Sequence, residues 1–90
     1  MAATVFIRHR VSDYATWRSA YDGFAEGQRS GGVTGQAVYQ TDGDPNEVTV
    51  THDFATVEAA RAFMASAPLR DTMAGGGVTG QPDVWYTQKA

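Results

Sequence analysis

The feature that most constrains the fold of this chain is an alternation of apolar and polar side chains in two separate segments. Residues 4–11 and 47–54 both repeat with a period of two, which is the side-chain period of a β-strand. We therefore predict two neighbouring central strands, antiparallel to each other, each with one face toward a core. The predicted core-facing residues are Val5, Ile7, His9, Val11, Val48, Val50, His52 and Phe54.

Two other stretches carry the three- and four-residue spacing of apolar side chains that is typical of amphipathic helices. The first begins after Asp13, a residue type that caps helices well, and is predicted to run to about Arg29. The second begins after Thr56, and Pro68 is predicted to break or restart it, with a short continuation over residues 69–73.

Glycine-rich segments are predicted to end both helices. The tetrapeptide Gly-Val-Thr-Gly occurs twice, at residues 32–35 and 77–80. Both copies follow a predicted helix and precede a predicted strand. We therefore expect each copy to form the same helix-to-strand connection.

The remaining strands are predicted at residues 33–41 and at about 83–88, and the turn-forming residues 42–46 predict a hairpin. The element order is then β-α-β-β-α-β. Right-handed crossovers convert this order into a four-stranded antiparallel sheet with two helices on one face. Residues 1–90 are enough for one domain, so we predict a single ferredoxin-like α+β domain.

The composition argues against several classes of function. The chain has no cysteine, so it can form neither a disulfide framework nor a thiolate metal site. Its net charge is −3 and its basic residues form no stripe, which argues against binding to nucleic acid. No stretch approaches the roughly 20 apolar residues that span a bilayer, and Arg8 interrupts any secretory signal, so we expect a cytoplasmic protein without membrane association.

The sheet face that the helices leave open is predicted to carry both apolar and polar side chains. Phe6, Val38 and Trp85 are expected there, beside Arg8 and Gln36. A second copy of the chain would cover such a face by twofold symmetry. We therefore predict a homodimer through the open sheet face, and the alternative is a monomer with a partly apolar face.

Several short motifs, distributed over nearly the whole chain, make a family resemblance visible. They are HRVxDYxxWxxxYD at 9–22, DPNEV at 44–48, HDF at 52–54, EAAxAF at 58–63 and PLR at 68–70. With these motifs the chain resembles small bacterial members of the dimeric α/β-barrel superfamily, close to the antibiotic biosynthesis monooxygenase-like group. The resemblance implies two sheets packed into a barrel across a dimer, with a ligand pocket in each subunit between the sheet and the helices.

The resemblance implies a cofactor-free monooxygenase or a cyclase/isomerase, acting on a small aromatic or polyketide-like substrate. Two further hypotheses compete with it. One is a non-catalytic dimeric ligand-binding or accessory domain that uses the same pocket, and the other is a structural module whose pocket is filled by its own side chains. Haem-degrading members resemble each other through an Asn on the first strand and a His on the second helix, and this chain has neither there. Fold alone does not choose among the other functions.

The two histidines are the candidate general bases, His52 first and His9 second. A neutral His, with an unperturbed pKa of about 6.5, can take a proton from a phenol or an enol. The two rings are expected on the order of 10 Å apart, which is too far for a shared metal site. The alternative is that each His is a strand-end residue hydrogen-bonded to a backbone group.

Six further residues are candidate substrate contacts, because aromatic rings can form a wall against a planar ligand and methionine adapts to a variable one. The alternative is that they are ordinary core residues. These candidates are Tyr14, Trp17, Tyr21, Phe54, Met64 and Met73.

Overall fold

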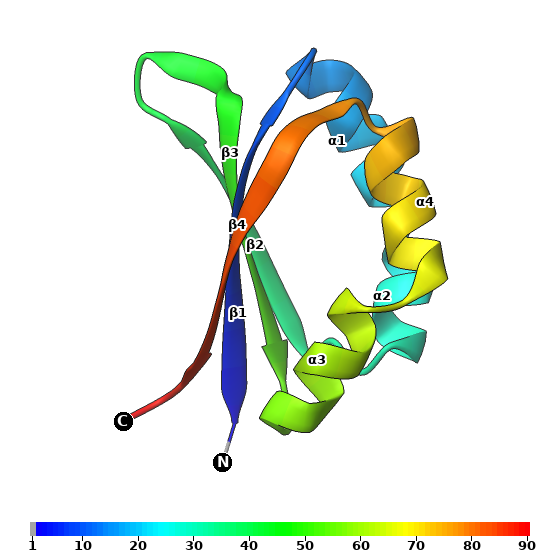
Figure 1. Ribbon diagram of the computed structural model, residues 1–90, viewed down its shortest axis with the longest axis vertical. Helices are drawn as coiled ribbons and strands as arrows, with labels where there is room; N and C mark the ends of the chain where they lie inside the picture. Colours follow the sequence, from blue (N-terminus) through cyan, green and yellow to red (C-terminus); the bar gives the residue numbers. More distant parts are fainter. Residues whose placement is uncertain (1) are drawn as a thin grey trace.

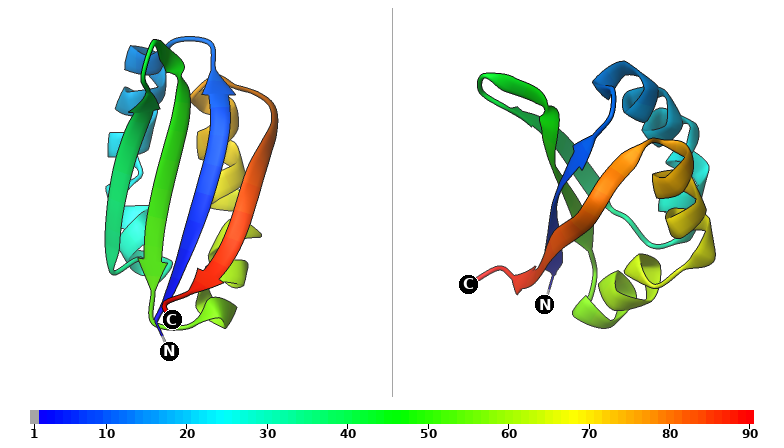
Figure 2. Two further views of the ribbon diagram at one scale, coloured as in Figure 1. Left: turned by 90° about the vertical axis from the view of Figure 1, so that its left-hand side faces the viewer. Right: turned by 45° about the horizontal axis from the view of Figure 1, so that its top comes forward.

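The computed structural model describes residues 2–90 and confirms the predicted α+β class (Figure 1). Four antiparallel strands form one sheet in the order β2-β3-β1-β4, and all of the helices lie on one face of it (Figure 2). No helix within residues 2–90 is long and apolar enough to cross a membrane. The elements are β1 (Ala3–Val11), α1 (Tyr14–Gly23), α2 (Ala25–Ser30), β2 (Gly35–Thr41), β3 (Asp44–Phe54), α3 (Val57–Met64), α4 (Ala67–Gly75) and β4 (Val78–Gln88).

The two central strands are β1 and β3, as the alternation predicts. Val5 lies opposite His52, and His9 lies opposite Val48. Residues directly opposite each other in an antiparallel pair share a face of the sheet, so the two apolar sets meet on the helix side. All eight predicted core-facing residues of these strands are buried.

The first helical region differs from the prediction of one helix reaching Arg29. Helix α1 ends at Gly23, Phe24 leaves the helical conformation with φ −95° and ψ 10°, and α2 follows. The ring of Phe24 occupies the place where a side chain at Gly27 would stand, since a Cβ there would lie 2.2 Å from Cε1 of Phe24. Two glycines in this stretch weaken the helix, and the packing of Phe24 then determines where it bends.

The second helical region restarts at Pro68, as predicted, but the new helix is longer than residues 69–73. Helix α4 begins at Ala67, with Pro68 in its first turn and the Ser66 hydroxyl accepting a hydrogen bond from the backbone N–H of Leu69 at 3.4 Å. Proline is well tolerated at this position because its nitrogen would have no partner inside the helix.

Strand β4 begins at Val78, five residues before the predicted start. The second Gly-Val-Thr-Gly copy therefore lies mostly inside a strand, and only its first glycine matches the first copy. Gly32 and Gly77 both follow a helix with positive φ values of 94° and 78°. The pairing of β4 with β1 is irregular between Arg8 and Arg10, where β4 contains two extra residues. This β-bulge faces the position of His9 on β1.

The register of β2 shows that the prediction of Gln36 and Val38 on the open face is wrong. Gln36 lies opposite His52 and Val38 lies opposite Val50, so both point to the helix side. Ala37 and Tyr39 take the outward positions instead. Phe6 and Trp85 lie on the open face as predicted, directly opposite each other.

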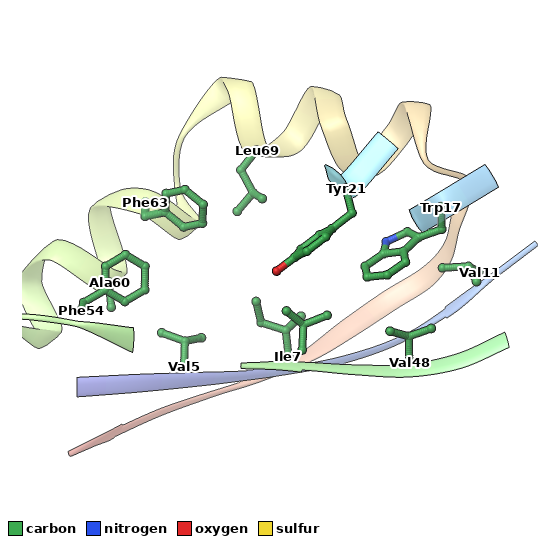
Figure 3. Close-up of a cluster of buried hydrophobic side chains, with 11 residues drawn as sticks. Val5, Ile7, Val11, Trp17, Tyr21, Val48, Phe54, Ala60, Phe63 and Leu69 are labelled. Carbon is green, nitrogen blue, oxygen red and sulfur yellow. The ribbon is translucent and has the colours of Figure 1, made fainter. Parts of the chain in front are cut away.

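The core fills the space between the sheet and the helices (Figure 3). Trp17 and Tyr21 reach down from α1, Phe63 from α3 and Leu69 from α4. They pack on the aliphatic side chains of β1 and β3 to form one continuous cluster.

Candidate functional site

A small cavity lies in the core between the sheet, α1 and α4, and its volume is about 30 Å³. Such a space holds about one water molecule and is smaller than an aromatic ring. Five of the eight predicted site residues line it. The lining consists of Ile7, His9, Trp17, Ala20, Tyr21, Phe24, Gln28, Val50, His52, Leu69, Thr72 and Met73.

His52 is the most buried polar side chain of the cavity wall, with 2% of its surface exposed. Its Nε2 atom lies 3.0 Å from the hydroxyl of Tyr21, and its Nδ1 atom is buried without a hydrogen-bond partner. Burial lowers the pKa of His52 to about 4, against a small opposing effect of Asp53. The ring is therefore neutral at pH 7, so only one of its two nitrogens carries a proton.

Tyr21 connects His52 to the edge strand. Its hydroxyl donates a hydrogen bond to Oε1 of Gln36, so the His52 nitrogen beside it must be the donor of the second bond. This arrangement places the proton of His52 on Nε2 and leaves the Nδ1 lone pair free. Burial raises the pKa of Tyr21 to about 12, so the phenol stays protonated.

His9 occupies the other end of the cavity, with 6% of its surface exposed. Its Nδ1 atom also has no partner, and burial lowers its pKa, with its own backbone and Glu47 opposing the shift. Val5, opposite His52, is four residues before His9 on β1, so the two rings are about 13 Å apart at ~3.3 Å per residue. For His52, Nδ1 has no hydrogen bond to the backbone, unlike the expectation for an ordinary strand-end residue.

The rings between the two histidines form a continuous stack. Trp17 lies 5.5 Å from His9 and 4.9 Å from Tyr21 between ring centroids, and Tyr21 is nearly parallel to His52 at 6.0 Å. Figure 3 shows the planes of Trp17 and Tyr21 side by side above the sheet. The stack provides a flat apolar wall along the cavity.

Three predicted substrate contacts lie away from the cavity. Tyr14 packs beyond Trp17 at 5.9 Å, and Phe54 packs against Phe63 at 5.5 Å. Met64 lines a separate groove beside β4, which Met73 also lines. The structure therefore brings together His9, His52, Trp17, Tyr21 and Met73.

Two glutamines complete the site and were not among the predicted residues. The prediction of Gln36 on the open face is wrong, and the sequence pattern points to no role for Gln28. Gln28 is buried, with 3% of its surface exposed, and lines the cavity. No feature of the sequence distinguishes Gln28 from an exposed polar residue, because its burial depends on where α1 ends and α2 begins.

No group of three or more histidine, aspartate or glutamate side chains that could hold a metal ion occurs within residues 2–90. The arrangement supplies a neutral imidazole with a free nitrogen, a protonated phenol beside it and an apolar wall. These groups can accept, donate and position a proton.

No protein-family model and no curated protein matches the sequence. Solved structures do match over nearly the whole chain. A proposed antibiotic biosynthesis monooxygenase from Bordetella bronchiseptica is 19% identical, with a TM-score of 0.84, and the match covers 99% of this chain and 97% of the other.

Two further solved structures match the fold over nearly the whole chain. SnoaB, a cofactor-independent oxygenase from Streptomyces nogalater, is 13% identical, with a TM-score of 0.76 over 99% of this chain and 95% of its own. A conserved protein from Methanosarcina mazei is also 13% identical, with a TM-score of 0.80 over 100% of this chain and 94% of its own. The chain therefore has the ferredoxin-like fold of the antibiotic biosynthesis monooxygenase-like proteins.

Proposed function

We propose that this protein is a cofactor-independent monooxygenase or a cyclase/isomerase that acts on a small aromatic or polyketide-like substrate, with His52 as general base. The observation that carries the proposal is the Nδ1 atom of a buried imidazole, which has no hydrogen-bond partner and belongs to a ring beside a wall of stacked aromatic side chains. The neutral ring can accept a phenol or enol proton, and the Tyr21 oxygen would then receive the hydrogen bond of the imidazolium.

The proposal makes two demands on the protein. A cavity of about 30 Å³ must enlarge before a ring can enter, and Leu69, Thr72 and Met73 place α4 on the wall that has to move. The pKa of about 4 also makes His52 a weak base in the empty site. A substrate that becomes an anion as it loses its proton would stabilise the imidazolium and raise this pKa.

For oxygenation, a deprotonated phenol is electron-rich enough to reduce oxygen itself. One oxygen atom would enter the substrate, and the other would leave as water with two hydrogens of the substrate. A cyclase or isomerase would use the same proton transfer without consuming oxygen.

The proposal includes a homodimer in which the open sheet faces of two subunits meet. The row of Phe6 and Trp85 supports it, since these side chains remain 38% and 51% exposed in the single chain. We also propose a cytoplasmic location, with which a chain that lacks cysteine is compatible.

The test is oxygen uptake and substrate loss with a panel of mono-, bi- and tricyclic phenols. We expect His52→Gln and His52→Ala to reduce turnover about 100-fold or more while the circular dichroism spectrum stays unchanged, because general-base catalysis contributes factors of that order. Glu58→Gln, at an exposed position on α3, is the control and should retain full turnover. Substrate loss without oxygen uptake would identify a cyclase or isomerase.

Retained activity in both His52→Ala and His9→Ala would exclude the histidine base. A second candidate function, a non-catalytic ligand-binding or accessory domain, is favoured by the low pKa of His52, which makes it a weak base. It predicts saturable binding of a phenol with no chemical change in the bound compound.

A further inference from the structure

A second hollow lies next to the cavity, between α4 and β4. It is an open groove with a volume of about 380 Å³, which falls in the range of typical small-molecule sites. Met64, Val84 and Tyr86 contribute apolar surface to it. The cavity with the histidines is too small for a ring, whereas this groove is large enough for one.

Met73 lines both the cavity and the groove, so this one side chain separates them. The positions of the residues along α4 explain why Met73 lines both hollows. Leu69 and Thr72 face the cavity, Arg70 and Ala74 face the groove, and Met73 lies on the edge between these two sides of the helix. Methionine has three flexible bonds and changes its conformation at low cost, so it is suited to such a boundary.

The bulge of β4 shapes the far wall of the groove. Gly80, Gln81 and Pro82 line it, and Gly80 has a positive φ of 71°. The extra residues leave His9 on β1 without a paired residue on β4. Bulges often occur beside binding sites because they redirect a strand locally.

The charges at the groove are positive and unpaired. Arg70 lines it and donates one hydrogen bond to the carbonyl oxygen of Ala65 at 3.2 Å, which leaves most of its five N–H groups free. Arg61 stacks over Tyr86 with its guanidinium carbon 4.3 Å from the ring centroid. Within residues 2–90 every other arginine pairs with a carboxylate, and these two do not.

We infer that the groove and the cavity form one site for a flat aromatic carboxylate, with the carboxylate on Arg70 and the ring directed past Met73 toward Trp17 and Tyr21. The groove is large enough for the ring, and the Arg70 guanidinium can donate two parallel hydrogen bonds to a carboxylate. The stacked rings of Trp17 and Tyr21 extend the apolar surface from the groove into the cavity. This inference rests on the proposed function for its substrate, and it narrows the substrate class to acids.

The test compares two ligands of the same shape, 6-hydroxy-2-naphthoic acid and its neutral primary amide, by isothermal titration calorimetry. We expect the natural protein to bind the acid about tenfold more tightly than the amide, since a charge-assisted pair in an open groove contributes at the low end of its range. Arg70→Gln should remove this preference and leave the affinity for the amide unchanged. Arg70→Lys should restore part of it.

Two further variants make the test specific. Arg29→Gln removes an arginine on α2 that already pairs with Glu26, and should leave both affinities unchanged. Met73→Ala should tighten binding of both ligands several-fold, because it opens the boundary between the groove and the cavity. Equal affinities for acid and amide, equal weakening of both by Arg70→Gln, or no binding of either at about 10 mM would overturn the inference.

The outcome also separates this inference from the proposed function. Selective binding of the acid without any turnover of acids or phenols would support the site and reject the enzyme. Turnover that depends on His52, together with equal affinities for the acid and the amide, would support the enzyme and reject the carboxylate site.

Discussion

The two faces of the sheet belong to the same four strands but bury their side chains very differently. On the helix side, the side chains of β1 and β3 are almost entirely buried, including the two imidazoles. On the open side, Phe6, Trp85 and Tyr39 remain 38%, 51% and 57% exposed. The helix side therefore buries two imidazole nitrogens that have no hydrogen-bond partner, and the open side exposes large aromatic side chains to solvent.

The charged and titratable side chains also differ between the two faces of the sheet. Arg10 pairs with Asp44 at 2.7 Å and with Glu47 at 2.8 Å, and Arg8 pairs with Glu47 at 3.0 Å, all on the open face. The central strands β1 and β3 place His9 and His52 on the helix side, and burial lowers the pKa of both. This division supports the two proposals made above, a general base on the helix side and a dimer interface on the open side. Buried titratable groups with shifted pKa values are common at functional sites, and exposed apolar patches are common at interfaces.

The largest effect is expected from removing a buried ring on the helix side. Phe54→Ala should lower the free energy of unfolding by about 3–5 kcal/mol, since the side chain is 1% exposed and leaves a cavity between β3 and α3. Urea unfolding, measured at two protein concentrations, gives the value. Phe6→Ala on the open face is the matched control and should cost less than about 1 kcal/mol at the lower concentration. Equal losses would contradict the division between the faces.

The next effect concerns pH. The pKa of His52 falls from 6.5 to about 4 on folding, so the unfolded chain binds the proton more tightly. The contribution of the neutral, buried His52 ring to the free energy of unfolding is fully present above pH 6.5. It is lost as the pH falls toward 4, and the total loss is about 3 kcal/mol at ~1.4 kcal/mol per pH unit. His9 shifts in the same direction and adds to the loss.

Unfolding in urea at pH 7, 6, 5 and 4.5 tests this expectation. His52→Phe should flatten the dependence, and His9→Phe should flatten it further. The carboxylates on the open face lose their contribution only at lower pH, because Arg10 and Arg8 lower the pKa values of Asp44 and Glu47. Stability that stays constant from pH 7 to 4.5 would show that the histidines are not buried as the structure describes.

The alternation in β1 and β3 predicts the fold because these strands have one strictly buried face. Strand β2 shows where such reasoning fails. The predicted turn over residues 42–46 aligns Thr41 with Glu47, and counting back from it pairs Val38 with Val50, which faces the helices. The structure has this pairing, with Gln40 opposite Val48 and Val38 opposite Val50, so the prediction of Val38 on the open face was wrong even though the turn residues were consistent with the observed register. The residues of β2 alone do not identify its buried face, because both faces of the strand mix polar and apolar side chains.

The candidate site was predictable to the same extent as the strands that support it. The alternation of side chains along β1 and β3 predicts that His9 and His52 face the helices. The three- and four-residue spacing in the first helix predicts that Trp17 and Tyr21 share one face. The contact of Tyr21 with Gln36 depends on the register of β2, and the division between cavity and groove depends on where α4 restarts. These features are set by tertiary packing, which a single sequence does not display.

An intermediate effect is expected on the open face. Trp85→Ala should weaken the proposed dimer by about 2 kcal/mol, roughly 30-fold in the dissociation constant, since a large aromatic side chain at the centre of an interface is a typical hot spot. Sedimentation equilibrium measures the change. Arg29→Ala on the helix layer is the control and should leave the dimer intact. A natural protein that is monomeric at all concentrations would exclude association through this face.

The smallest effect compares two tyrosines on opposite faces. Tyr21→Phe removes the hydroxyl between Gln36 and His52, which leaves both nitrogens of a buried imidazole without a partner. The expected cost is about 1–2 kcal/mol in the free energy of unfolding, the penalty of one unsatisfied buried polar group. Tyr39→Phe, at an exposed outward position, should change it by less than about 0.5 kcal/mol. If Tyr21→Phe is as harmless as Tyr39→Phe, the hydroxyl does not support His52, and the assignment of the free proton-accepting nitrogen to Nδ1 fails with it.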